Sequence, residues 1–119
     1  MSNSSGLQMV ERDFAGLSEL RRGVLVLAVL SQLRGPQYGY SLKQALIDRD
    51  MPIEEGTLYP LLRRLEAQGL LASAWNTDHA PPRRYYQLSP QGLAALEALS
   101  KGWRDQVRVM DRLLDGEAP

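Results

Sequence analysis

The most constraining feature of this sequence is a long amphipathic segment that follows Ser89-Pro90, a helix cap with a proline in the first helical position. The predicted helix reaches about Leu114 and spans about 37 Å, more than the width of the small body that the rest of the chain can form. Part of it must therefore project. Its apolar stripe then needs a partner, for which we expect a second copy of the chain. The stripe comprises Leu96, Leu99, Trp103, Val107, Met110 and Leu114.

Shorter elements precede this helix. We expect residues 1–6 to form a disordered tail and residues 7–17 a short amphipathic helix. The next helix, capped by Ser18 and apolar in its middle, ends at Gly35-Pro36. That proline suits the first turn of a third helix.

The most regular of the shorter helices is predicted at residues 55–68. Its leucines recur at positions i, i+3, i+4 and i+7 and so form one core-facing stripe, made of Leu58, Leu61, Leu62 and Leu65. The opposite face carries small and basic residues, namely Gly56, Pro60, Arg63 and Ala67, with Tyr59 and Arg64 beside them. Residues 70–75 and 83–88 have the partial alternation of short strands, and the loop between them is rich in turn residues, which indicates a β-hairpin.

This order of elements predicts a mainly α fold of the α+β class. Residues 18–88 would form a winged helix-turn-helix, and residues 89–119 a long C-terminal dimerisation helix. In a helix-turn-helix the second helix of the motif enters the major groove of DNA. The helix at 55–68 is therefore the predicted recognition helix, with the hairpin as the wing.

The composition argues against several functional classes. Cysteine is absent and there is one histidine, so we expect no metal site and no cofactor. No nucleophile–base pair is visible, and the neighbouring acids Glu54 and Glu55 would diverge on a helix, so we expect no enzyme. The longest apolar run is far shorter than a membrane span of about 20 residues. We expect a soluble cytoplasmic protein.

Charge is informative only locally. The formal net charge is zero, but residues 56–89 contain four arginines and two acids. Phosphate contact needs such a basic patch and not a basic chain as a whole. The neutral total slightly favours an alternative, in which the winged helix binds a protein and not specific DNA.

Several motifs in one order resemble the PadR family of transcriptional regulators. They are Leu20-Arg-Arg-Gly23, Tyr38-Gly-Tyr40, Gly56-Thr-Leu-Tyr-Pro-Leu-Leu-Arg-Arg-Leu-Glu66, Gly69-Leu70, Pro82-Arg-Arg-Tyr-Tyr-Gln-Leu-Ser89 and Gly92, with Trp103 following. The resemblance covers residues 20–92 and implies a dimeric repressor, often released by a small planar or phenolic ligand. The short chain looks like the subgroup with a single C-terminal helix.

The predicted DNA contacts lie on the recognition helix, the helix before it and the wing. Arginine can bind a phosphate or read guanine, while the alternatives are local capping, a solvated face or a pair such as Arg63 with Glu66. The resemblance suggests that one of Tyr38 and Tyr40 faces DNA, and we favour Tyr38. The predicted set is Tyr38, Lys43, Thr57, Tyr59, Pro60, Arg63, Arg64, His79, Arg83 and Arg84.

Trp103 is the main candidate for effector binding. In a two-fold dimer it would face its symmetry mate, and two aromatic faces can form a slot for a planar molecule. The alternative is plain dimer packing. The predicted interface residues are Phe14, Leu96, Leu99, Trp103, Val107 and Met110, whereas Trp75 is expected to be structural.

Overall fold

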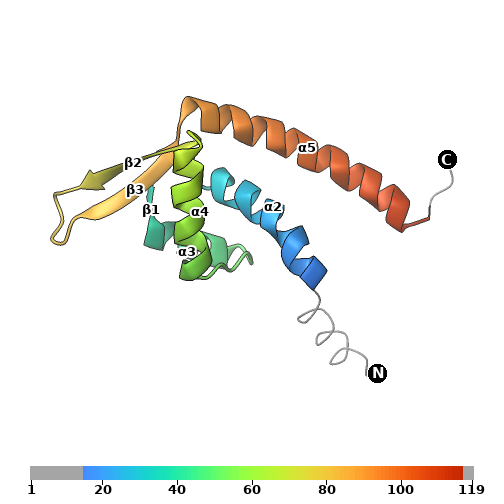
Figure 1. Cartoon of the computed structure of the whole chain (residues 1–119), viewed down its shortest axis with the longest axis horizontal. Helices are drawn as coiled ribbons and strands as arrows, with labels where there is room; N and C mark the ends of the chain where they lie inside the picture. Colours follow the sequence, from blue (N-terminus) through green and yellow to red (C-terminus); the bar gives the residue numbers. More distant parts are fainter. Residues whose placement is uncertain (1–14, 117–119) are drawn as a thin grey trace, which may run out of the picture.

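The computed structural model describes residues 15–116 and contains four helices and three strands in that range (Figure 1). The elements follow one another as α2 (Ala15–Ser31), β1 (Gln37–Tyr38), α3 (Gly39–Asp48), α4 (Glu55–Ala67), β2 (Leu71–Asn76), β3 (Arg83–Leu88) and α5 (Pro90–Leu114). This is the predicted order of helices, hairpin and long helix, and the winged helix-turn-helix is confirmed.

The core lies where α2, α3 and α4 meet beneath the sheet, and leucine dominates it. The predicted stripe of α4 is buried along its whole length, as the i, i+3, i+4, i+7 spacing requires. The residues least exposed to solvent are Val29, Leu30, Leu33, Leu42, Leu46, Leu58, Leu62, Leu65 and Leu96. The opposite face of α4 is left free.

The first described helix, α2, differs from the prediction at its start. A boundary between two helices was expected at residues 17 and 18, but α2 begins at Ala15 and continues through both. Ser18 therefore lies within the helix and does not cap it; serine has only a modestly lower helix propensity than alanine. Phe14 and the predicted tail at residues 1–6 lie outside the described residues.

The sheet has one strand more than expected. Its order is β1-β3-β2, and all of its pairs are antiparallel. The strand β1 pairs with β3 through Gln37 opposite Tyr86 and Tyr38 opposite Tyr85. Pro36 therefore precedes a strand, and the expectation that it opens the third helix is wrong.

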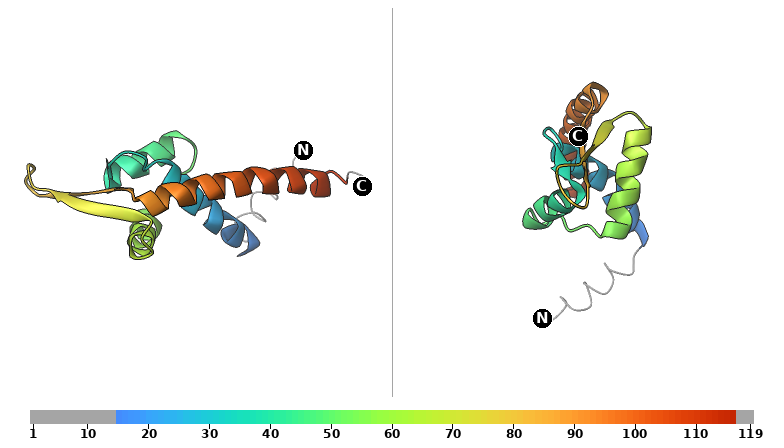
Figure 2. Two further views of the ribbon diagram at one scale, coloured as in Figure 1. Left: turned by 90° about the horizontal axis from the view of Figure 1, so that it is seen from above. Right: turned by 90° about the vertical axis from the view of Figure 1, so that its left-hand side faces the viewer.

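The long helix α5 begins as predicted. The Ser89 hydroxyl accepts a hydrogen bond from the Gly92 backbone N–H at 3.0 Å, and Pro90 occupies the first turn. Only its first part packs on the body, as Figures 1 and 2 show. Leu96 is 1% exposed and belongs to the core of the body, which corrects its placement at a dimer interface. Within residues 15–116, every helix is too short or too polar to span a lipid bilayer.

Candidate nucleic-acid interface

The free face of α4 carries small and basic side chains. Gly56, Thr57, Pro60, Arg63 and Arg64 are all exposed, opposite the leucine stripe. No ion pair within residues 15–116 joins either arginine to an acid. Pro60 lies in the second turn and not at the start of the helix, so the Gly56 carbonyl lacks its usual helical donor. Two guanidinium groups and a small-residue surface are thus available to a ligand.

On one side of α4 is a groove of about 570 Å³ that we call the tyrosine groove. The helices α3 and α4 and the sheet form its walls, and Arg63 is the α4 cation that lines it. The complete lining is Tyr38, Gly39, Tyr40, Ser41, Tyr59, Arg63, Arg83, Arg84 and Tyr86. Of the lining side chains, Tyr40, Arg63 and Arg83 are exposed and can contact a sugar-phosphate backbone by hydrogen bonding and charge.

Tyr38 of β1 and Tyr40 of α3 differ in their exposure to solvent. The difference runs against the prediction that Tyr38 is the one that faces DNA. The Tyr38 hydroxyl accepts a hydrogen bond from Asn76 Nδ2 at 2.7 Å, and its ring is half-buried. The ring also meets Tyr85 edge-on at 6.2 Å between centroids. Tyr40 is 72% exposed. Tyr40 is therefore the better placed of the two to contact a partner.

The wing contributes a second exposed guanidinium to the tyrosine groove. Arg83 is exposed, and its Cζ lies 5.7 Å from the centre of the Tyr38 ring, so a cation–π contact orients it. His79 is exposed in the loop between β2 and β3, with its ring edge-on to Tyr38 at 6.4 Å. Both side chains occupy the region predicted for wing contacts.

On the other side of α4 is a smaller groove of about 290 Å³, the α2 groove. It is lined by Arg22, Leu25, Gly56, Thr57, Pro60, Leu61 and Arg64. An adjoining hollow adds Arg21, whose guanidinium donates to the Pro52 carbonyl oxygen. Sequence reasoning missed Arg21 and Arg22 as site residues, although both stood in the motif Leu20-Arg-Arg-Gly23. Their place on the exposed side of α2, beside Thr57, could not be derived without the packing angle of the two helices.

Lys43 and Tyr59 have partners inside the molecule. Lys43 Nζ lies 3.4 Å from Glu55 Oε1, so this lysine forms an ion pair with the first turn of α4. The Tyr59 ring packs over Gly39 so closely that a Cβ there would lie 2.5 Å from Tyr59 Cε1. Both side chains therefore join α3 to α4, in addition to any contact with a ligand.

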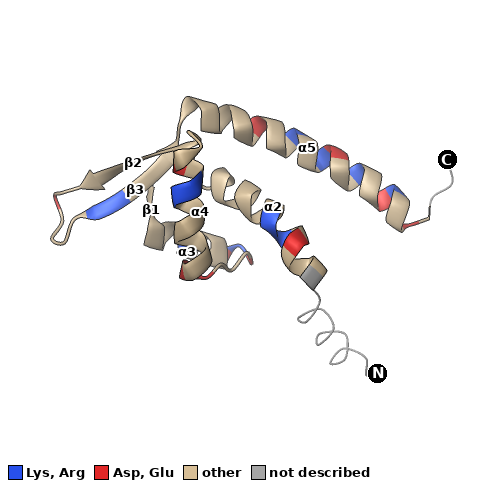
Figure 3. Ribbon diagram, viewed as in Figure 1, with Lys and Arg blue, Asp and Glu red and all other residues tan. Residues whose placement is uncertain are grey.

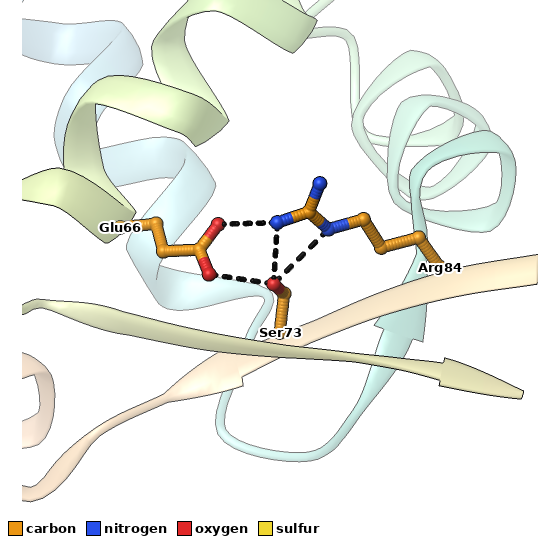
Figure 4. A network of polar contacts seen from close by, with 3 residues as sticks. All are labelled: Glu66, Ser73 and Arg84. Atoms are coloured by element: carbon orange, nitrogen blue, oxygen red, sulfur yellow. Dashed lines mark hydrogen bonds and ion pairs between the residues drawn. The ribbon is translucent and has the colours of Figure 1, made fainter.

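Arg84 is engaged inside the protein as well. Figure 4 shows its guanidinium bound to Glu66 of α4 and to Ser73 of β2. The possible partner of Glu66 considered from sequence was Arg63, but the observed partner is Arg84, at 3.0 Å. The prediction that Arg84 contacts DNA therefore has no support in the geometry.

Figure 3 shows basic residues on α2, α4 and β3, and others along α5, where they alternate with acidic residues. Arg22, Arg63, Arg64 and Arg83 are all exposed and border the two grooves. Among residues 15–116 no group of histidine, aspartate and glutamate could hold a metal ion. The four exposed arginines form a basic surface that suits an extended polyanion.

The projecting part of α5 presents unpartnered apolar side chains. Leu99 is 44%, Trp103 48% and Met110 43% exposed, and Val107 is half-buried. Trp75 is 60% exposed, and its ring contacts the Arg84 guanidinium at 5.8 Å on the face of the wing that carries Arg84. The α5 stripe is separate from the α4 face.

Comparisons with known proteins agree with this geometry. The family model of PadR-like transcriptional regulators matches residues 26–98. A transcriptional regulator of Mycobacterium tuberculosis is 37% identical over 81 residues, which cover 67% of this chain and 76% of that protein. The crystal structure of a PadR family transcriptional regulator from Eggerthella lenta is similar with a TM-score of 0.78 and 49% identity, covering 84% of this chain and 89% of that one. A PadR-like transcriptional regulator from Bacillus cereus gives a TM-score of 0.72 at 29% identity and covers 83% and 99%. The chain therefore belongs to the PadR-like family of transcriptional regulators.

Proposed function

We propose that this regulator binds duplex DNA by placing the free face of α4 in the major groove. The single observation that carries the proposal is the position of four exposed arginines on both sides of that face. Arg63 and Arg83 border the tyrosine groove, whereas Arg22 and Arg64 border the α2 groove. A helix in the major groove has a phosphate strand on either side, and each groove offers cations to one of them.

We further propose that the chain acts as a homodimer held by α5. The apolar side chains of the projecting half are exposed in the single chain, and contact with a second copy would cover them. A two-fold dimer would present two copies of α4 to half-sites about 34–36 Å apart, which implies a pseudo-palindromic operator. Repression would follow where such an operator overlaps a promoter.

The effector proposal concerns Trp103, which is half-exposed on α5. Across a dimer axis it would face its symmetry mate, and a planar ligand between the two rings would change the crossing of the α5 helices. The distance between the two copies of α4 would then no longer match the operator. Tryptophan quenching by planar carboxylic acids and aromatic drugs tests this proposal. Because Trp75 also fluoresces, the Trp103→Phe variant is the necessary control.

The main experiment is selection of a duplex from a random DNA library by the purified chain, followed by fluorescence anisotropy at several salt concentrations. We expect a pseudo-palindromic consensus and an affinity that falls steeply with salt. If no duplex is enriched and none binds even at low salt, DNA binding is refuted, and a winged helix that binds protein becomes the better explanation.

A further inference from the structure

A polar network joins the recognition helix to the wing. Arg84 Nη2 on β3 donates to Glu66 Oε1 in the last turns of α4 at 3.0 Å. Arg84 Nε and Nη2 both donate to Ser73 Oγ on β2, at 3.0 and 2.8 Å. The Ser73 hydroxyl in turn donates to Glu66 Oε2 at 2.6 Å. The three side chains thus close a ring of hydrogen bonds across three elements (Figure 4).

The surroundings of Arg84 hold this ring in one geometry. Its guanidinium lies 5.8 Å from the centre of the Trp75 ring and 5.5 Å from that of Tyr86. The side chains of Arg84 and Glu66 are only 37% and 30% exposed. Two cation–π contacts and a half-buried carboxylate restrict the guanidinium far more than a surface ion pair would.

The network connects the two elements that carry Arg63 and Arg83, the exposed cations of the tyrosine groove. Arg63 is on α4, about one turn before Glu66, and Arg83 is adjacent to Arg84 on β3. Neighbouring side chains on a strand point to opposite faces, so Arg83 is exposed whereas Arg84 is half-buried against Glu66 and Ser73. A rotation of the wing relative to α4 would change the separation of Arg63 and Arg83, and the network opposes such a rotation because its hydrogen bonds join α4 to both strands of the wing.

We propose that Glu66, Ser73 and Arg84 are positioning residues that hold the wing at the angle to α4 required for operator recognition, without contacting DNA themselves. The inference rests on the proposed function. It makes a prediction opposite to that of simple electrostatics. Removal of a carboxylate beside a DNA-binding face should strengthen binding if charge alone matters. If the carboxylate positions the wing, its removal should weaken binding to the specific site.

The test measures binding of Glu66→Ala and Ser73→Ala to two duplexes, one selected by the wild-type chain and one scrambled duplex of equal length. We expect Glu66→Ala to bind the selected duplex about tenfold more weakly, comparable to losing one base contact. Its affinity for the scrambled duplex should stay equal or rise. Ser73→Ala, which changes no charge, should weaken selected binding in the same direction. Glu97→Ala, at an exposed acid on α5, removes the same charge and should leave selected binding intact.

Two results would overturn the inference. One is selected binding by Glu66→Ala that equals or exceeds that of the wild type. The other is a fall of about 0.9 per subunit in the salt slope of Arg84→Ala, which would show a direct phosphate contact. Thermal denaturation identifies a variant that does not fold, and Ser73→Ala is the milder change that decides the question in that case. If the wild-type chain itself selects no duplex, the proposed function fails, a result distinct from any behaviour of the variants.

Discussion

Replacing Arg63 and Arg64 together by alanine should abolish specific DNA binding while the fold stays intact. Both side chains are exposed on α4, and no ion pair in the described range would be lost. Alanine is at least as good a helix former as arginine. The free energy of unfolding should therefore change by no more than about 0.5 kcal/mol.

The expected loss of affinity follows from counterion release. Each phosphate contact contributes about 0.9 to the slope of log K against log salt, so at 0.1 M salt it contributes about 0.9 decades of affinity, or about 1.2 kcal/mol. If both arginines contact phosphates, the double variant should lose about 60-fold per subunit at that salt concentration. For DNA held by two subunits the loss should reach several thousandfold.

Fluorescence anisotropy with a labelled selected duplex, from 50 to 300 mM potassium chloride, measures both the affinity and the slope. The matched control is the double variant Arg34→Ala and Arg104→Ala, which removes the same charge from exposed positions outside both grooves. An unchanged affinity and slope in the Arg63 and Arg64 variant, with a normal melting temperature, would refute α4 as the recognition helix.

Three further changes test other parts of the structure. Gly92→Ala would place a Cβ against the Leu70 backbone, 2.9 Å from its carbonyl carbon. Calorimetry should therefore show a loss of about 2 kcal/mol or more in the free energy of unfolding. An unchanged melting temperature would contradict this packing. Gly39→Ala should displace the Tyr59 ring, so anisotropy should show weaker DNA binding even where the protein remains folded at the assay temperature. An affinity equal to that of the wild type would speak against a role for that ring. Met110→Ser replaces an apolar side chain that is 43% exposed in the single chain and would be covered in an α5 dimer. Sedimentation equilibrium should show self-association weakened by about 1 kcal/mol per subunit. An effect on monomer stability alone would refute the α5 interface.

Helices whose apolar residues recur with strong helical periodicity could be predicted from the sequence. The short strand β1, which has no such pattern, could not. The leucine stripe of α4 determines which face is buried, and the free face follows by geometry. The strand β1 has two residues, too few for any pattern, and it exists because Gln37 and Tyr38 find hydrogen-bonding partners on β3. Pairing between segments so distant in sequence is a tertiary effect that local propensity does not contain.

The same limit applies to the candidate site. A stripe of apolar residues shows that a face will be buried but not by what, so Leu96 and Leu99 look alike in sequence. In the structure the body covers Leu96, and Leu99 lies where the helix leaves it. The different roles of Arg83 and Arg84 depend on Glu66, which is 18 residues from Arg84 and is brought near it only by the fold.

Zero net charge does not oppose DNA binding once the charges are located. Charges on exposed surfaces are screened over about 8–10 Å at physiological salt, so acids on a remote helix have little effect at the interface. Asp105 of α5 pairs with Lys101 and Arg108 of the same helix, and its charge is balanced there. Around α4, by contrast, Arg63 and Arg64 are exposed with no ion pair in the described range. The local density of free cations, and not the total, therefore sets the attraction for phosphate.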